Sequence, residues 1–158
     1  MSTEDYVDIV KKIDDVKAGK LTFYFSPIQW RTYTQTHNWK NEKLDGEYET
    51  QIPETPGIYT LLLQPCTQNH PTCYLMYVGK TNCLRTRFKQ YLKMERDINK
   101  RPHVAYFLNK YDPYVNFCYT LVPEESLDQV ENSFMQAYLP PLNEQYEGEF
   151  SIIMRAAF

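Results

Sequence analysis

Two β-rich runs separated by a polar turn constrain the fold of this chain more than any other feature. The runs are GIYTLLLQ (57–64) and CYLMYVGK (73–80), and the turn between them is PCTQNHPT (65–72). Runs of this length, rich in β-branched and aromatic residues, predict strands. The connection is a long turn, and the two strands are expected to pair antiparallel as a hairpin with an enlarged loop.

The segments after the hairpin predict further helices and one more strand. Residues 84–93 carry apolar side chains at i, i+4, i+7 and i+8, behind Asn82 as a candidate N-cap, and so predict a helix. A second helical piece is expected over His103–Lys110, and VNFCYTLV (115–122) predicts a third strand. Ser126 and Gln129 form a capping-box signature before a last helix, which ends at Pro140.

These elements predict an α+β fold: a small, mainly antiparallel three-stranded sheet flanked by helices, with an N-terminal helical extension. At 158 residues the chain is long enough for one ordinary domain. We assign 1–52 to the extension, 53–146 to the main domain and 147–158 to a tail packed on it. The extension combines an amphipathic helix over 2–18 with an irregular segment suited to target recognition or dimerisation.

Composition predicts a cytoplasmic protein without a membrane span. No apolar run approaches ~20 residues, and the start MSTEDYVDIV is acidic, unlike a secretory leader. The four cysteines are then expected to be reduced. Cys66, His70 and Cys73 lie close together, but their spacing matches no standard zinc pattern and a fourth ligand is missing, so their role stays open.

The charges are segregated along the chain. Eight Lys or Arg and two Asp or Glu lie between Lys80 and Arg101, a local net charge of +6 in a chain whose net charge is -3. Such a run alone is more typical of a solvated helix face than of a nucleic-acid contact. If the chain does bind nucleic acid, the residues expected to make the contacts are Arg85, Lys89, Lys93, Arg96, Lys100 and Arg101.

Four short motifs follow one another from the first strand to the last helix. They are Gly57-Ile58-Tyr59, Tyr77-Val78-Gly79-Lys80, Arg87 with Tyr91, and Glu131 with Asn143. Together they resemble the GIY-YIG nuclease superfamily over residues 57–143. YVGKTNCLRTRFKQY and ENSFMQAYLPPLN are also similar to the corresponding stretches of bacterial excision-repair incision nucleases.

The resemblance implies a metal-dependent endonuclease in which Glu131 holds one divalent cation and Arg87 is the catalytic arginine. The cation is expected to be Mg²⁺, with Mn²⁺ as a substitute. Hydrolysis of a phosphodiester requires a deprotonated water, a neutralised phosphate and a stabilised leaving oxygen. Glu131 fits the metal role because it lies at the edge of its helix's apolar stripe, where a carboxylate needs a compensating cation.

The remaining motif residues are expected to serve the same site. One tyrosine is predicted to deprotonate the attacking water, Tyr77 first and Tyr59 second, with Lys80 and metal-bound water lowering its pKa. Tyr91 lies where some family members carry histidine, so it is either a base or a hydrogen-bonding partner. Asn143 is expected to tie its loop to the active-site strand.

We therefore expect the fold to gather phenols, a guanidinium and a carboxylate around one phosphate-sized hollow. DNA is the expected substrate, and we expect a homodimer if both strands are cut. Two alternatives stay open: an RNA-directed nuclease, since nothing in the sequence distinguishes the two sugars, and an inactive nucleic-acid-binding module of the same fold.

Overall fold

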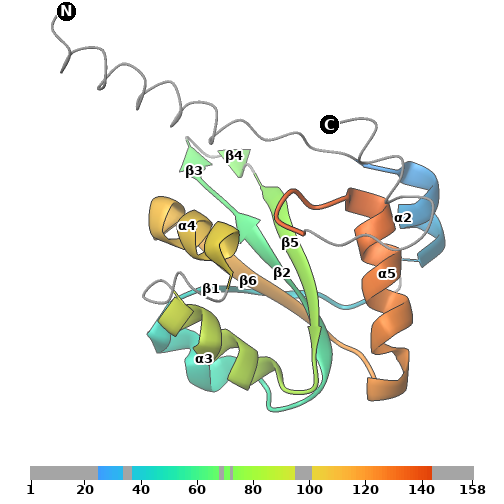
Figure 1. The fold of residues 1–158 in the computed structure, drawn as a ribbon, viewed down its shortest axis with the longest axis horizontal. Helices are drawn as coiled ribbons and strands as arrows, with labels where there is room; N and C mark the ends of the chain where they lie inside the picture. Colours follow the sequence, from blue (N-terminus) through green and yellow to red (C-terminus); the bar gives the residue numbers. More distant parts are fainter. Residues whose placement is uncertain (1–24, 34–36, 68–69, 72, 95–100, 144–158) are drawn as a thin grey trace, which may run out of the picture.

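A computed structural model describes residues 25–33, 37–67, 70–71, 73–94 and 101–143 of the chain (Figure 1). The predicted helix over 2–18, the predicted tail 147–158, Arg96 and Lys100 lie outside these ranges. The described elements are, in chain order, α2 (Pro27–Tyr33), β1 (Lys40–Lys43), the 3-10 helix η1 (Gly46–Gln51), β2 (Gly57–Leu63), β3 (Cys66–Thr67), β4 (His70–Pro71), β5 (Tyr74–Thr81), α3 (Leu84–Met94), α4 (Pro102–Tyr111), β6 (Val115–Leu121), the 3-10 helix η2 (Glu124–Ser126) and α5 (Leu127–Tyr138).

The predicted hairpin is the centre of the fold. β2 and β5 pair antiparallel, with Gly57 opposite Thr81 and Tyr59 opposite Gly79, and the enlarged loop carries the short β3–β4 ribbon. β6 pairs with the other side of β2, also antiparallel. The expected α+β class and antiparallel sheet are therefore confirmed.

The sheet has four strands, in the order β1-β6-β2-β5, and not the three that the sequence predicts. β1 pairs antiparallel with β6, so residues 40–43 belong to the sheet, although they were assigned to the N-terminal extension. The sequence KNEK gave no signal because this edge strand is mostly exposed and has no alternation of apolar and polar residues.

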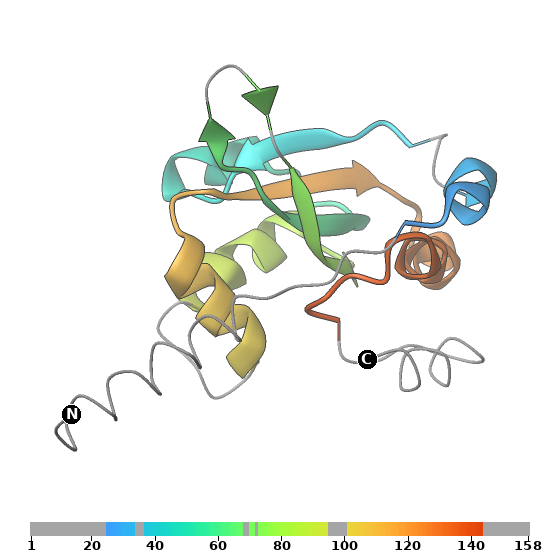
Figure 2. The same cartoon turned by 90° about the horizontal axis from the view of Figure 1, so that it is seen from above.

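Helices cover both faces of the sheet, as the view from above in Figure 2 shows. On one face, α3 and α4 pack against a core that includes Tyr59, Leu61 and Phe117. On the other face, α5 packs against a smaller core that includes Ile58 and Val78. The first five residues of β2 are buried for this reason, because its alternating side chains enter a core on either side.

Two predicted helix caps are wrong. Asn82 does not cap α3: among the described residues its amide oxygen accepts no backbone N–H, while its Nδ2 donates to Glu124 Oε1 and the Thr81 Oγ1 accepts from the Cys83 N–H. Ser126 makes no side-chain capping bond, because the η2 turn leads directly into α5. The predicted end of α5 is confirmed: Leu139 adopts a left-handed conformation, with φ 41°, just before Pro140.

Among the described residues, no helix combines the length and the apolar character that a membrane crossing requires.

Candidate active site

β5 presents its motif residues alternately to the two faces of the sheet. Tyr77 and Gly79 point toward the core beneath α3, while Val78 and Lys80 point toward α5. β5 is an edge strand of the four-stranded sheet, and α3 and α5 lie on either side of it (Figure 1). Groups on both faces are therefore brought to one edge.

Three tyrosines form a phenol cluster beneath α3. The Tyr59 and Tyr91 hydroxyl oxygens are 3.0 Å apart and share a hydrogen bond, and the Tyr59 and Tyr77 rings stack with centroids 6.1 Å apart. Burial, and secondarily the neighbouring phenols, raise the pKa of Tyr59 well above its ordinary value. Burial also raises the pKa of Tyr91. Both phenols are thus neutral at physiological pH.

Gly79 provides the space that the phenol cluster occupies. A Cβ at this position would lie 2.5 Å from the Tyr59 Oη and 2.9 Å from Tyr77 Cε1. No side chain larger than hydrogen fits without moving one of the two rings. The glycine of the second motif is therefore required by packing.

Arg87 extends from α3 to the phenol cluster. Its Cζ lies 6.0 Å from the centroid of the Tyr59 ring. The Nε is buried and has no hydrogen-bond partner among the described residues. A buried donor without an acceptor costs folding free energy. An anionic ligand bound at this guanidinium would supply the missing acceptor.

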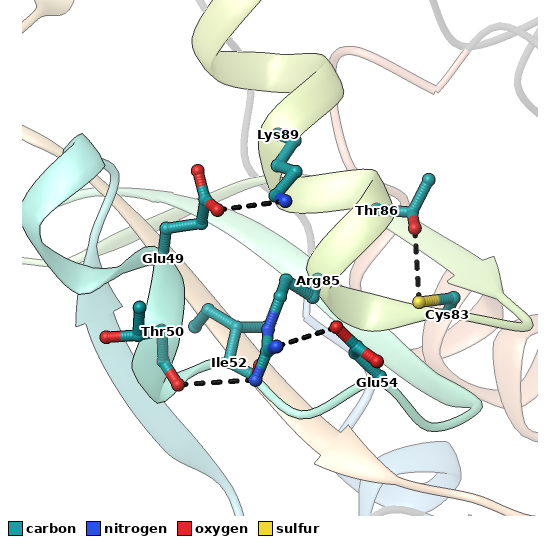
Figure 3. Close-up of polar contacts among 8 residues, drawn as sticks. All are labelled: Glu49, Thr50, Ile52, Glu54, Cys83, Arg85, Thr86 and Lys89. Atoms are coloured by element: carbon teal, nitrogen blue, oxygen red, sulfur yellow. Dashed lines mark hydrogen bonds and ion pairs between the residues drawn. The ribbon is translucent and has the colours of Figure 1, made fainter.

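The two neighbouring cations of α3 are used differently, as Figure 3 shows. Arg85 Nε donates to the Ile52 carbonyl at 2.7 Å, and its Nη1 pairs with Glu54 at 2.6 Å. Lys89 pairs with Glu49 at 2.9 Å. These contacts tie α3 to the segment around η1, which falls in the predicted N-terminal extension, 1–52. Arg85 and Lys89, both expected at nucleic acid, already have partners within the chain.

A carboxylate–ammonium group lies on the other face of β5. Lys80 Nζ is 2.9 Å from Glu131 Oε2 and also pairs with Asp128. The Glu131 side chain is 17% exposed, whereas that of Asp128 is 83% exposed. Hydrogen bonds to Asp128 and Glu131 hold the pKa of the Lys80 ammonium above its ordinary value. The cation that Glu131 was expected to need is therefore supplied by the chain itself.

Asn143 makes the contact predicted for it. Its Nδ2 donates to the Val78 carbonyl at 2.8 Å, and its Oδ1 accepts from the Val78 N–H at 2.9 Å. The Leu142 N–H donates to the Met76 carbonyl at 3.0 Å. The segment after α5 thus covers part of the open edge of β5, which would otherwise expose unpaired backbone groups.

Arg101 replaces Lys80 as the cation beside Tyr77. It directly precedes α4, and its Nη1 donates to the Tyr77 Oη at 2.7 Å. Lys80 was expected to influence the tyrosine, but it points to the opposite face. Of the other predicted cations, Lys93 is exposed on α3.

Metal-ligand clusters of three or more His, Cys, Asp or Glu are absent from the described part of the chain. Cys73 is a free, exposed cysteine. The side chains of Cys66 and His70 lie outside the described residues.

Crystal structures of the GIY-YIG N-terminal endonuclease domain of UvrC from Thermotoga maritima are similar to this chain. One, a point mutant bound to its catalytic divalent cation, is 19% identical, with 63% of this chain and 93% of that chain covered and a TM-score of 0.43. Another point mutant bound to the catalytic divalent cation is 18% identical, with 64% and 99% covered and a TM-score of 0.42. Neither a known family model nor a curated protein matches the chain.

The predicted residues come together as two groups. The phenol–guanidinium group comprises Tyr59, Tyr77, Tyr91, Arg87 and Arg101. The carboxylate–ammonium group comprises Lys80, Asp128 and Glu131. Within the described residues no ion pair joins Glu131 to Arg87, since the two approach β5 from opposite faces. The single hollow expected from the sequence is thus replaced by two clusters on either side of one edge strand.

Sequence reasoning missed Asp128 and the contact between Arg101 and Tyr77. Asp128 lies three residues before Glu131, a spacing that places both carboxylates within reach of one cation. For Arg101 no local signal exists, because Tyr77 lies 24 residues earlier in the chain.

Proposed function

We propose that this protein is a divalent-metal-dependent endonuclease that hydrolyses phosphodiester bonds in DNA. The proposal rests on the position of Arg87 and on the missing hydrogen-bond partner of its Nε within the described residues. It is a guanidinium beside a cluster of phenols, with a buried Nε that has no partner in the described part of the chain. Other cations of the basic segment, including Lys80, Arg85 and Lys89, pair with carboxylates of the chain. Arg87 is therefore the one of these four most suited to hold a phosphate oxygen.

The carboxylates of Glu131 and Asp128 are ligands of the kind that a hard divalent cation takes, and such a cation would have to displace the Lys80 ammonium that now pairs with both. Glu131 offers a largely buried carboxylate, and Asp128 offers a second, exposed one nearby. Mg²⁺ typically takes one or two protein carboxylates and keeps several waters. Glu131 is the proposed ligand of Mg²⁺, or of Mn²⁺ in its place. Bound there, the cation would polarise a phosphoryl oxygen and supply an acidified water.

Tyr77 is the proposed general base, and Tyr59 is the second choice. Burial raises the pKa of Tyr59, which argues against its losing a proton during turnover. Tyr77 is half-buried, and its Oη accepts a hydrogen bond from Arg101. To act as a base, this phenol must first release its own proton to solvent, and the guanidinium would stabilise the phenolate that then takes a proton from the attacking water. Tyr59 and Tyr91 then act by holding the Tyr77 ring and Arg87 in place.

A plasmid-nicking assay with added Mg²⁺ tests the proposal. The wild type is expected to nick, and Glu131→Gln is expected to lose nicking because an amide is a poorer ligand for a hard cation. Glu125→Gln, an exposed position on η2, is the matched control and should nick like the wild type. Tyr77→Phe should lose cleavage and keep DNA binding, and wild-type turnover in this variant would remove Tyr77 from the mechanism.

The same assay separates the alternatives. If the wild type and Glu131→Gln are equally inactive on DNA and on RNA but bind one of them, the protein is a binding module. If only RNA is cut, the proposed DNA substrate is wrong, but the proposed roles of the catalytic groups are unaffected. Linearised plasmid, as opposed to nicked circles, would favour a homodimer that cuts both strands.

A further inference from the structure

A cavity lies on the α5 face of the sheet, opposite the phenol–guanidinium group. Its volume is about 520 Å³, within the ~300–1,000 Å³ typical of small-molecule sites. Two helices and the loop before β1 form its walls, and three strands form its floor. The described residues that line it are Trp30, His37, Trp39, Thr60, Leu62, Leu75, Cys118, Phe134 and Tyr138.

The lining is aromatic and uncharged. Five of the nine residues carry aromatic rings. Burial lowers the pKa of His37, so its imidazole is neutral at pH 7, with one donor and one acceptor. Burial raises the pKa of the Cys118 thiol to about 11, so it stays protonated. Such a lining suits a flat, neutral heterocycle and disfavours a phosphate or a metal ion.

The rings are held by one another before any ligand arrives. Trp39 packs edge-on against Phe134, with centroids 4.9 Å apart, and Phe134 lies parallel to Tyr138 at 6.3 Å. Trp30 and Trp39 are each only half-buried. A wall fixed in this way loses little conformational freedom on binding, which favours affinity.

The cavity is adjacent to the proposed metal ligand. Phe134 follows Glu131 by three residues on α5, so the two side chains project from neighbouring positions, separated by about 4.5 Å along the helix axis. A strand with its phosphate at Glu131 therefore carries a base close to the aromatic wall. A stacked base in duplex DNA is not available to such a wall and must first leave the stack.

We propose that this cavity receives one unstacked base of the DNA strand that is cut, and that it contributes to the choice of cleavage position. The inference rests on the proposed nuclease function, because that function supplies the strand. Aromatic walls hold single-stranded bases by stacking, and the polar groups of His37 and Thr60 offer hydrogen bonds to a base edge.

The chain provides its own probe, since Trp30 and Trp39 are its 2 tryptophans and both line the cavity. Arg87→Lys protein, which keeps Glu131, is titrated in the presence of Mg²⁺ with a short single-stranded DNA and with an abasic chain of equal length while tryptophan emission is recorded. The base-containing strand is expected to quench emission saturably, and the abasic strand is not. Equal responses to the two strands, or no response to either, would overturn the inference.

Two substitutions sharpen this experiment. Trp39→Leu, in the same background, is expected to weaken binding of the base-containing strand roughly tenfold. Tyr114→Leu removes an aromatic residue that is exposed and outside the cavity, and should bind normally. If Trp39→Leu does not fold, Thr60→Val keeps the size of the floor residue, removes its hydroxyl and should alter base preference. Unchanged affinity and base preference in every folded cavity variant would contradict the inference.

Failure of the cavity inference and failure of the nuclease proposal give different results. Nicking by the wild type with no base-dependent quenching would refute the cavity inference and keep the nuclease. Base-dependent quenching without nicking under any divalent cation would keep a base-binding cavity and refute the nuclease.

Discussion

Gly79→Ala tests how rigidly β5 holds the phenol cluster. The new methyl group would lie 2.5 Å from the Tyr59 Oη and 2.6 Å from its Cζ, distances that require the ring to move. The backbone φ of Gly79 lies outside the left-handed region, so alanine adds no conformational strain there. Any loss of stability must therefore come from packing.

The magnitude follows from how tightly Tyr59 is held. Its ring is 1% exposed and stacks on Phe117 with centroids 5.1 Å apart, which leaves it little room to move. Overpacking of this kind costs about 1–3 kcal/mol of unfolding free energy. Displacing the ring also breaks the hydrogen bond to Tyr91, worth about 1 kcal/mol. The total expected loss is about 2–4 kcal/mol.

Urea unfolding measures this loss, and Gly46→Ala is the matched control. A Cβ at Gly46 meets nothing within 4 Å, so alanine there should be neutral or stabilise by up to ~1 kcal/mol through the unfolded chain. The midpoint should fall for Gly79→Ala, with an unchanged slope against urea concentration. Equal midpoints for the two variants would refute the claim that Gly79 is required by packing.

Three further predictions concern other contacts of the site. Asn143→Ala leaves two backbone groups of Val78 without partners and should lower the unfolding free energy by about 1–3 kcal/mol in urea; wild-type stability would contradict this. Arg87→Lys keeps the charge but loses the fork of donors, so nicking should fall at least ~100-fold, while DNA affinity in filter binding changes far less. The Thr86 hydroxyl bonds the Cys83 sulfur and lowers the pKa of that thiol, so Thr86→Val should slow Cys83 alkylation near pH 8 but not at high pH, measured by peptide mass spectrometry; equal rates near pH 8 would refute this.

Local patterns predicted most of the architecture. The hairpin, the three principal strands and the helices from residue 84 onward follow from periods that each segment displays by itself. The features that were missed depend on partners far away in the chain. Asn82 resembles an N-cap, but its amide bonds to Glu124, 42 residues later. β1 is exposed at an edge, so no hydrophobic signal reports its pairing with β6.

In the candidate site, too, local patterns predicted some features, whereas contacts with distant residues were missed. The spacing of the motifs identified Tyr59, Arg87 and Asn143, and these residues do gather around β5. The role expected of Lys80 conflicts with the period of two in a strand. Lys80 is three residues after Tyr77, so the two side chains must project to opposite faces. Lys80 accordingly pairs with carboxylates of α5, and the cation beside Tyr77 comes from elsewhere in the chain.

Under the proposed function, the edge position of β5 would allow the two groups on opposite faces to contact one substrate. In an interior strand, neighbouring strands on both sides would keep the groups apart, whereas a ligand lying against an open edge can contact both faces. The outward-facing backbone groups of β5 belong to Met76, Val78 and Lys80, because antiparallel pairing alternates them. Within the described residues, the segment ending at Asn143 bonds to the backbone of Met76 and Val78 and does not reach Lys80. We therefore propose the edge beside Lys80 and Glu131, next to Gly79, as the place where a phosphate of the substrate would approach both groups.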